Sequence, residues 1–280
     1  MGTFHTPVLL QSACNFLDIR PDRLYIDATY GGGGHTSEII KRGGKVLGID
    51  QDQESIDYSH LAEVRSPALT SAKGNFMLLT QIAKDNNFSR VDGILFDLGV
   101  SSHQINNPQR GFSFQSHGPL DMRMDQSAGI SASALIDALN SKQLENILKN
   151  FGQLSNAKSI SEKIISSRPI KTTDQLAGLF SDFKTRQLVF QSLRIAVNAE
   201  LVALESGLSQ SLELLKPGGR IVAISFHSLE DRIIKNYFVN WEKKHLGKII
   251  TKKPIVPDLS EIQSNSRSKS SKLRCFQKYD

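Results

Sequence analysis

Hydrophobic and polar positions along the chain predict two kinds of element in separate stretches. Short apolar runs bounded by turn residues predict buried strands, and several of these runs end in an acidic residue. The expected strands are 24–27, 45–50, a weaker one within 68–76, 91–97, 220–226, and two closing strands within 248–256 and 272–276. Seven strands, most of them separated by helical patterns, predict an α/β fold with a mostly parallel sheet.

Apolar residues spaced by three and four predict the helices between those strands. An amphipathic lead-in helix is expected from Thr6 to about Arg20, and one long helix is expected from Val197 to Leu215. The turn Lys216–Gly219 then leads into the fifth strand. Ser228 and Asp231 have the spacing of a capping box, which predicts the start of a further helix there.

The strand and helix alternation is interrupted in the middle of the chain. Residues 104–125 are rich in turn signals, and short helical patterns follow around 135–139, 144–151 and 160–165. Thr172 and Gln175 predict one more capped helix. We therefore expect an all-helical domain at 107–193, inserted into a main domain formed by 1–106 and 194–280.

Composition limits the class of protein. With 280 residues, 39% hydrophobic and 22% charged, the chain resembles a soluble globular protein. It contains no apolar run of membrane-spanning length, and Met1–His5 lacks the pattern of a secretion signal, which argues against a membrane or secreted protein. Cys14 and Cys275 are too few for a disulfide framework or a zinc site, so we interpret them as packing residues in a reducing compartment. His103 and His117 are too isolated to suggest a metal site.

Positive charge is concentrated at the C-terminal end of the chain. From Arg232 onward there are twelve Lys and Arg against four Asp and Glu, whereas the rest of the chain has 22 against 24. A solvated basic face and a polyanion site explain such charge equally well. Small hydroxyl residues between the cations of 267–274 favour contact with a phosphate backbone.

The stretch after the first strand is the main candidate for a ligand site. Asp27 ends the strand, four glycines at 31–34 allow positive φ and close backbone approach, and Thr36 or Ser37 is the expected cap of the next helix. A strand, a glycine turn and a helix form the first unit of a doubly wound nucleotide-binding sheet, whose ligands lie beyond the carboxyl ends of the strands.

Spacing distinguishes among the ligands that such a turn can hold. A dinucleotide fingerprint needs G-x-G-x-x-G, but the sixth residue counted from Gly31 is Thr36, and from Gly32 it is Ser37. The third glycine is absent, which disfavours a nicotinamide- or flavin-dependent oxidoreductase. Asp27, Asp50 and Asp97 at three strand ends suit S-adenosylmethionine, which carries an ammonium, a sulfonium and ribose hydroxyls. Each feature alone has an ordinary explanation, and their order along one sheet favours a methyltransferase.

Long segments of the chain resemble one family closely. The segments are 5–10, 27–36, 97–104, 110–114, 118–125 and 224–232, and the resemblance extends from Thr6 to the 270–274 tail. Gly118–Asp125, which reads Gly-Pro-Leu-Asp-Met-Arg-Met-Asp, is too long to match by chance. These segments resemble the bacterial ribosomal small subunit methyltransferase H family, also called MraW.

The resemblance implies a fold, an activity and a set of cofactor contacts. The implied fold is a class I S-adenosylmethionine-dependent methyltransferase, Rossmann-like, with a helical insertion. The implied activity is cytoplasmic methylation of N4 of one decoding-centre cytidine in 16S ribosomal RNA, with no membrane involved. Carried over by motif, the cofactor contacts are Gly33, Gly34, His35, Asp50, Phe76, Asp97 and Gln104. One departure is the run 184–191, where the family's usual His-Pro-Ala-Thr-Arg is not intact.

The residues that would act on the substrate are a hypothesis. Asp97, Ser101 and Ser102 are the candidate catalytic residues, because an acceptor near the amino hydrogens helps the nitrogen to become pyramidal. The proline and aromatic residues usual after this strand in amino-methylating enzymes are missing, so the residues alone do not identify cytosine N4. The candidate substrate contacts are Phe112, Phe114, Arg123, His227, Arg267, Lys269 and Lys272. For the first four, ordinary packing, ion pairing or capping is an equally good explanation.

The exact function, the form of the substrate and the oligomeric state stay open from the sequence alone. The enzyme could methylate another RNA or DNA base, or the chain could be a non-catalytic RNA-binding factor in ribosome assembly. The substrate could be naked RNA or an assembled 30S particle. The oligomeric state is also open, with a homodimer among the options.

Overall fold

The computed structural model describes residues 7–61 and 66–280, so His5 and Thr6 of the family segments lie outside it. The chain forms two compact units, Met1–Ser101 with Leu201–Asp280, and Ser102–Glu200. The domain boundaries expected after residues 106 and 193 both fall a few residues inside the second unit. Each unit has a hydrophobic core of its own.

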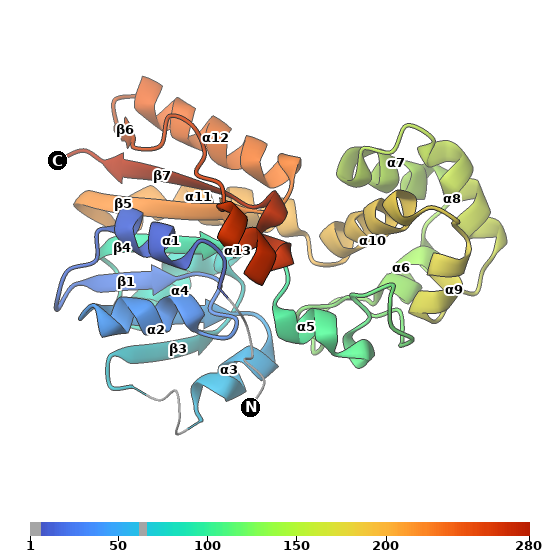
Figure 1. The fold of residues 1–280 in the computed structure, drawn as a ribbon, viewed down its shortest axis with the longest axis horizontal. Coiled ribbons are helices and arrows are strands. Elements are labelled where there is room, and N and C mark those ends of the chain that lie inside the picture. The colour runs from blue at the N-terminus through green and yellow to red at the C-terminus, as the bar shows by residue number, and fades with distance from the viewer. Residues whose placement is uncertain (1–6, 62–65) are drawn as a thin grey trace. The chain divides into compact units, whose positions relative to one another are not determined.

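The first unit is built on a seven-stranded sheet with the order β3-β2-β1-β4-β5-β7-β6 (Figure 1). The first five strands pair in parallel, and β7 runs antiparallel to both of its neighbours. This arrangement confirms the expected α/β fold with a mostly parallel seven-stranded sheet. The strands are β1 Leu24–Asp27, β2 Lys45–Asp50, β3 Leu69–Lys73, β4 Val91–Asp97, β5 Leu215–Ser225, β6 Gly247–Ile249 and β7 Lys272–Lys278.

Helices cover both faces of this sheet. Because neighbouring strand residues point to opposite faces, Tyr25 packs in the same cluster as α1 and α2, whereas Ile26 packs in the cluster of α4, α11 and α12. The α-helices of this unit are α1 Leu10–Leu17, α2 Gly34–Lys41, α3 Gln53–Ser59, α4 Leu79–Asp85, α11 Glu200–Leu214, α12 Ser228–Lys243 and α13 Leu259–Ser264, and the short 3₁₀ helices are η1 Phe76–Leu78 and η3 Ser266–Ser270.

The second unit is helical and packs its apolar stripes around one core. The expected capping box of Thr172 and Gln175 is present at the start of α9, and Asn140 with Gln143 forms another before α7. The helices are α5 Ser102–Asn106, η2 Pro108–Arg110, α6 Ala132–Ala138, α7 Ser141–Gly152, α8 Ala157–Ser166, α9 Thr173–Gly178 and α10 Phe183–Val197.

Three local expectations were wrong. The single long helix from Val197 is two helices, α10 and α11, because Ala199 adopts a left-handed conformation with φ of 48° while the apolar spacing continues past it. The turn at 216–219 lies inside β5 as an irregularity of its pairing with β4. The loop expected at 257–271 contains α13 and η3.

Both cysteines are buried and unbridged, as expected of packing residues. Burial raises the pKa of each thiol to about 12, so neither forms a thiolate at neutral pH. In the described part of the chain, every helix is too short or too polar to cross a bilayer.

Candidate functional site

Three carboxylates lie at one edge of the sheet of the first unit. Asp27, Asp50 and Asp97 are the last residues of β1, β2 and β4, which are parallel neighbours with β1 in the middle. From β1 the chain adds β2 and β3 on one side and then β4 and β5 on the other, and ligands of doubly wound sheets bind at such a switch point. The sheet therefore brings together the three acids that the sequence selected.

The glycine turn follows β1 and starts α2 earlier than expected. Gly33 is the N-terminal cap of α2, with φ of 70°, and the side chains of Thr36 and Ser37 do not cap the helix. Thr36 Oγ1 donates instead to Asp27 Oδ2 at 2.8 Å, and Ser37 Oγ donates to the Gly33 carbonyl at 2.7 Å. A Cβ added at Gly33 would lie 2.6 Å from the Tyr30 hydroxyl oxygen, so only glycine fits there.

Asp27 has a structural role within this edge. Its side chain is 1% exposed and accepts hydrogen bonds from Thr36 Oγ1 and from the backbone N–H of Thr29. Burial raises the pKa of Asp27, while the nearby His35 and these hydrogen bonds act in the opposite direction. The carboxylate thereby ties the end of β1 to the first turn of α2.

Asp50 supports the glycine turn through hydrogen bonds to the backbone. Its Oδ2 accepts the backbone N–H of Gly31 at 2.7 Å, and its Oδ1 accepts that of Asp52 at 2.8 Å. Removal from water raises the pKa of Asp50 to about 6, although both hydrogen bonds favour the ionised form. At neutral pH the group is an ionised acceptor that can bind hydroxyl groups.

Asp97 is held by two residues from the β1 end of the site. Its backbone N–H donates to Thr29 Oγ1 at 2.6 Å, and its Oδ2 lies 3.4 Å from Nδ1 of His35. The Nε2 of His35 lies 3.2 Å from the carbonyl oxygen of Val8. The His35 ring thus forms a hydrogen bond with the Val8 carbonyl and lies beside the Asp97 carboxylate.

Phe76 begins η1, directly after β3 and its following turn. Its ring lies edge-on to Phe96 with 5.6 Å between centroids, and it packs partly buried against the main core. Packing within the protein therefore accounts for one part of the Phe76 ring. Its expected stacking on adenine stays a prediction.

These residues fit S-adenosylmethionine by their chemistry. Gly33 and Gly34 let the turn pack closely against Tyr30 and Pro7, where an added Cβ would collide, so the turn itself exposes backbone rather than side chains. The Asp50 and Asp97 carboxylates provide acceptors for an ammonium and for ribose hydroxyls, whereas Asp27 is engaged within the protein. Gly33, Gly34, His35, Asp50 and Asp97 all belong to this edge of the first unit.

The remaining expected residues follow β4. Ser101 is the last residue of the first unit, while Ser102 and the buried Gln104 belong to α5 in the second. The catalytic assignment of Ser101 and Ser102 and the cofactor assignment of Gln104 therefore stay predictions.

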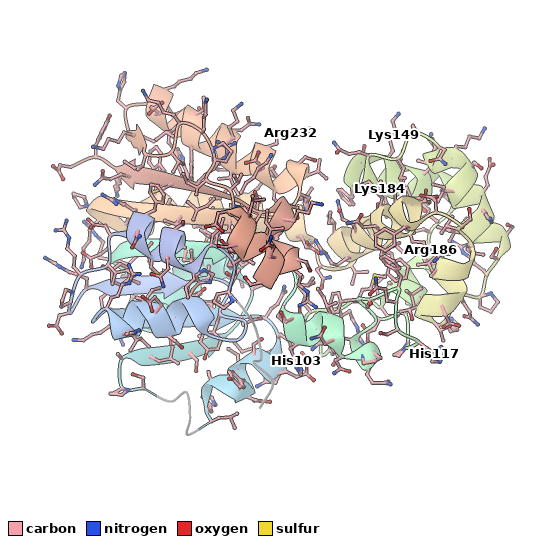
Figure 2. All side chains as sticks on the ribbon, in the orientation of Figure 1. His103, His117, Lys149, Lys184, Arg186 and Arg232 are labelled. Atoms are coloured by element: carbon pink, nitrogen blue, oxygen red, sulfur yellow. The ribbon has the colours of Figure 1, made fainter. Side chains whose placement is uncertain are left out.

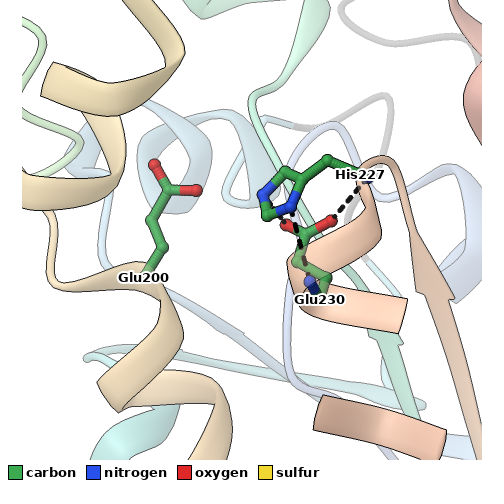
Figure 3. A group of neighbouring side chains, drawn as sticks. All are labelled: Glu200, His227 and Glu230. Atoms are coloured by element: carbon green, nitrogen blue, oxygen red, sulfur yellow. Dashed lines mark hydrogen bonds and ion pairs between the residues drawn. The ribbon is translucent and has the colours of Figure 1, made fainter. Parts of the chain in front are cut away.

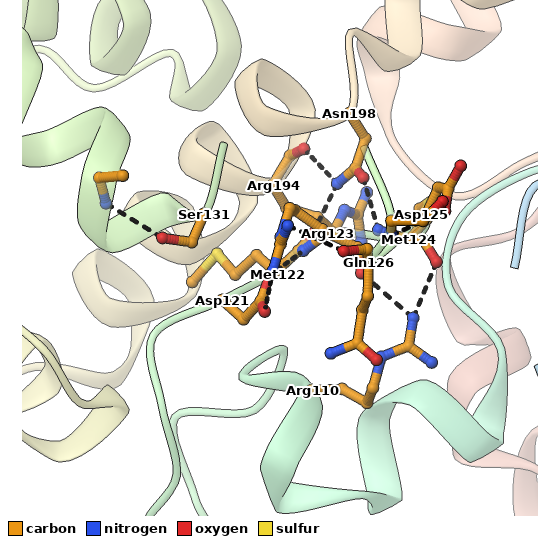
Figure 4. A network of polar contacts seen from close by, with 12 residues as sticks. Arg110, Asp121, Met122, Arg123, Met124, Asp125, Gln126, Ser131, Arg194 and Asn198 are labelled. Carbon is orange, nitrogen blue, oxygen red and sulfur yellow. Dashed lines mark hydrogen bonds and ion pairs between the residues drawn. The ribbon is translucent and has the colours of Figure 1, made fainter. Parts of the chain in front are cut away.

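The Gly118–Asp125 segment of the second unit is fixed by an arginine to which the sequence assigned no role (Figure 4). Arg110 is 1% exposed, and its Nη2 donates to the carbonyl oxygens of Arg123 and Met124 at 3.1 and 2.9 Å. Asn198 bonds both Met122 and Met124 from the other side. In the sequence, the one sign of this role was an arginine at the start of a loop rich in glycine and phenylalanine.

Arg123 forms an ion pair with Asp121 within its own loop. Its guanidinium binds Asp121 through Nε and Nη2 at 2.7 and 2.9 Å. Burial acts to raise the pKa of Asp121, but these contacts with Arg123 hold that pKa below its ordinary value. The ion pair explains Arg123 within its own loop, so its substrate contact stays a prediction.

Packing also explains the two phenylalanines proposed to stack on a base. Phe114 lies edge-on to Phe183 and Phe190, with centroids 5.2 and 5.4 Å apart. Phe112 packs partly buried against the same core, with the Arg110 guanidinium 5.9 Å from its ring centroid. Their stacking on an extruded base stays a prediction.

His227 caps α12, which corrects the expected box of Ser228 and Asp231. The Nδ1 of His227 accepts the backbone N–H of Glu230, whose carboxylate accepts the backbone N–H of His227 in return (Figure 3). An imidazole nitrogen can accept the capping hydrogen bond just as a hydroxyl oxygen can. The cap is therefore His227, one residue before the Ser228 that the usual preference for Ser or Thr predicts. Asp231 is then available to pair with Arg274 at 2.6 Å and Lys272 at 3.3 Å.

The basic C-terminal segment is divided between solvent and core. Arg267 and Lys269 are exposed on η3, whereas Lys272 and Arg274 pair with Asp231. Ser268 and Ser271 are 0% and 1% exposed and point into the protein, whereas Ser270 is exposed. Arg267, Lys269 and Ser270 are thus the exposed residues of 267–271.

Comparisons with known proteins identify the family of the chain. The model of the MraW methylase family matches residues 2–279. Ribosomal RNA small subunit methyltransferase H of Thermomicrobium roseum is 40% identical over 99% of this chain and 94% of its own length. The protein of the same name from Halothermothrix orenii is 41% identical over 96% and 97%. Among solved structures, an rRNA methylase from Streptococcus thermophilus covers 98% of both chains with 10% identity and a TM-score of 0.49.

Proposed function

The chain belongs to the MraW methylase family, a family of S-adenosylmethionine-dependent methyltransferases, and from this premise we propose that it methylates N4 of one decoding-centre cytidine in 16S ribosomal RNA. The family match and the named relatives confirm the expected family, enzyme class and cofactor. The observation that supports the proposal most strongly is the sheet edge where Asp27, Asp50 and Asp97 surround the glycine turn.

Each side chain at this edge has a distinct part in the proposed reaction. When bound, S-adenosylmethionine supplies an electrophilic methyl group. Asp50 accepts hydrogen bonds from ribose hydroxyls, and the glycine turn that it supports through Gly31 presents its backbone to the ligand. Asp97 accepts a hydrogen bond from the exocyclic amine, which turns the nitrogen lone pair out of conjugation with the ring. Alignment of the amine is the main contribution of the protein, because the leaving group is already activated.

The substrate in this proposal is the RNA within a 30S particle in the cytoplasm. The exposed cations Arg267 and Lys269 would contact its phosphates. The proposal includes a homodimer. Light scattering of the purified protein tests this oligomeric state directly.

The test uses 30S particles from cells that lack this protein. They are incubated with the protein and methyl-labelled S-adenosylmethionine, and the 16S RNA is digested to nucleosides. Label in N4-methylcytidine at one position is the expected result. Label in another nucleoside would identify a methyltransferase of a different base, and RNA binding without label would identify a non-catalytic factor. Asp97→Asn is expected to bind cofactor and lose methyl transfer, and near-normal rates in this variant would remove Asp97 from the mechanism.

A further inference from the structure

A cavity of the first unit lies at the edge where the parallel strands begin, opposite the edge that holds the glycine turn. Its volume is about 680 Å³, and its lining includes residues before or at the start of β1, β4 and β5 (Figure 1; side chains in Figure 2). Strand residues rise about 3.3 Å each, so the seven residues of β4 separate the two edges by about 20 Å. A group bound in this cavity is therefore separate from the proposed methyl-transfer site.

The lining of this cavity is strongly basic. It contains five cations and two acids, which is a formal excess of three positive charges. The cations are Arg20, Arg23, Arg90, Lys216 and Arg220, and the acids are Asp18 and Asp92. Four of the five cations are arginines, whose guanidinium groups stay charged and offer paired donors that match the geometry of phosphate. The lining therefore suits a ligand with several negative charges.

The two acids leave part of this charge uncompensated, because each lies beside two cations. These are Lys216 and Arg23 beside Asp92, at 2.7 and 3.8 Å, and Arg20 and Arg220 beside Asp18, at 2.9 and 3.7 Å. Arg90 forms no ion pair in the part of the chain that the structure describes. The side chains of Arg20 and Arg23 are 67% and 54% exposed. Three guanidinium groups thus keep donors for an added anion.

A bulge in β5 shapes one wall of the cavity. Residues 216–219 stand opposite Asp92 alone in the pairing of β5 with β4. The side-chain amide of Gln277 in β7 donates to the Gly218 carbonyl at 3.0 Å, which fixes the bulge. A Cβ added at Gly218 would have no atom within 4 Å, so the backbone there borders open space. Bulges often occur beside functional sites, and the cofactor edge at the other end of the strands gives this one no role.

We propose that this cavity is a second anion site, which binds phosphate groups through Arg20, Arg23 and Arg90. Arginine binds a phosphate through two parallel N–H donors, and the excess of positive charge in the lining attracts the ligand. Two sources supply this chemistry, the backbone of an RNA and a free polyphosphate. The site does not depend on the proposed function, because it lies at the other edge of the sheet.

Binding of two probes to the full chain tests the site. The probes are tripolyphosphate, followed by calorimetry, and a fluorescent single-stranded RNA, followed by anisotropy. Arg20→Ala/Arg23→Ala/Arg90→Ala is expected to lower the affinity for at least one probe about tenfold. If that probe is the RNA, the slope of log affinity against log salt should also decrease by about 2. Loss with tripolyphosphate shows that free polyphosphate is sufficient, whereas loss with RNA alone identifies the RNA backbone as the source.

The matched control is Lys243→Ala/Lys244→Ala/Lys248→Ala, which removes three exposed positive charges elsewhere in the first unit. An equal loss in the two triple variants, or no loss with either probe, would overturn the proposal. If the triple arginine variant fails to fold, Arg90→Ala alone breaks no ion pair and should still lower the affinity about twofold or more. A failure of the proposed methylation would leave these results unchanged, since no methyl transfer is measured.

Discussion

The Asp50 carboxylate accepts the backbone N–H of Gly31, with 2.7 Å between Oδ2 and the nitrogen. The bond connects the end of β2 to the glycine turn after β1, nineteen residues earlier in the chain. A second bond, from the backbone N–H of Asp52 at 2.8 Å, fixes the other carboxylate oxygen. The residue predicted to contact ribose therefore also supports the glycine turn.

Cofactor affinity is expected to fall at acidic pH because of Asp50. Removal from water raises the pKa of this carboxyl to about 6. The ionised form, which accepts hydrogen bonds from hydroxyls, dominates above that pH and is lost as the pH falls through it. Calorimetric titration with S-adenosylmethionine at pH about 7.5 and about 5 should show weaker binding at the lower pH.

Two substitutions identify the titrating group. Asp50→Asn should bind the cofactor at least about tenfold more weakly at neutral pH, with the pH dependence reduced. Asp57→Asn removes the same charge from an exposed position on α3 and should behave like the unmodified protein. An unchanged pH response in Asp50→Asn would assign the titration to another residue.

Gly33→Ala is expected to destabilise the first unit and weaken cofactor binding. Its φ of 70° is unfavourable for alanine, and the new Cβ would lie 2.6 Å from the Tyr30 hydroxyl oxygen. The free energy of unfolding in urea should fall by about 1–3 kcal/mol. Gly178→Ala, in a helical position with no atom within 4 Å of the added Cβ, is the matched control and should be neutral or slightly stabilising.

Arg110→Met is expected to destabilise the second unit strongly. The substitution removes the guanidinium that donates to the Arg123 and Met124 carbonyl oxygens in a fully buried position. A loss of about 2–4 kcal/mol in urea unfolding is expected, because carbonyls are left with fewer donors. Gln109→Met changes the neighbouring exposed residue and should shift stability by less than about 0.5 kcal/mol. Equal effects of the two substitutions would contradict the role of Arg110.

The double variant Arg267→Ala/Lys269→Ala is expected to weaken RNA binding. If both cations contact phosphates, the slope of log affinity against log salt should decrease by about 1.5. Lys243→Ala/Lys244→Ala removes the same charge from exposed positions at the end of α12 and is the matched control. Equal decreases in both double variants would indicate a diffuse effect of net charge instead of a site at η3.

Local patterns in the sequence predicted much of the fold and the cofactor edge. Strands β1, β2 and β4 were found with their terminal carboxylates because strand periodicity and turn residues are properties of adjacent residues. Helix starts were predicted less well. Gly33 replaced the expected Thr36 or Ser37 cap, and His227 replaced Ser228, because backbone conformation and the ring of a histidine decided each cap.

The sequence by itself determined the order of strands and helices, the glycine turn, and the acids at the strand ends, since each depends on residues close together in the chain. Only the tertiary structure decided which distant side chains meet. The contact of His35 with Val8 and Asp97, and that of Arg110 with the loop at 123–124, arise from packing between separate elements. Packing also decided which polar side chains are buried. It raised the pKa of Asp50 by removing the carboxyl from water, and it placed Ser268 and Ser271 inside the protein, which no local pattern encodes.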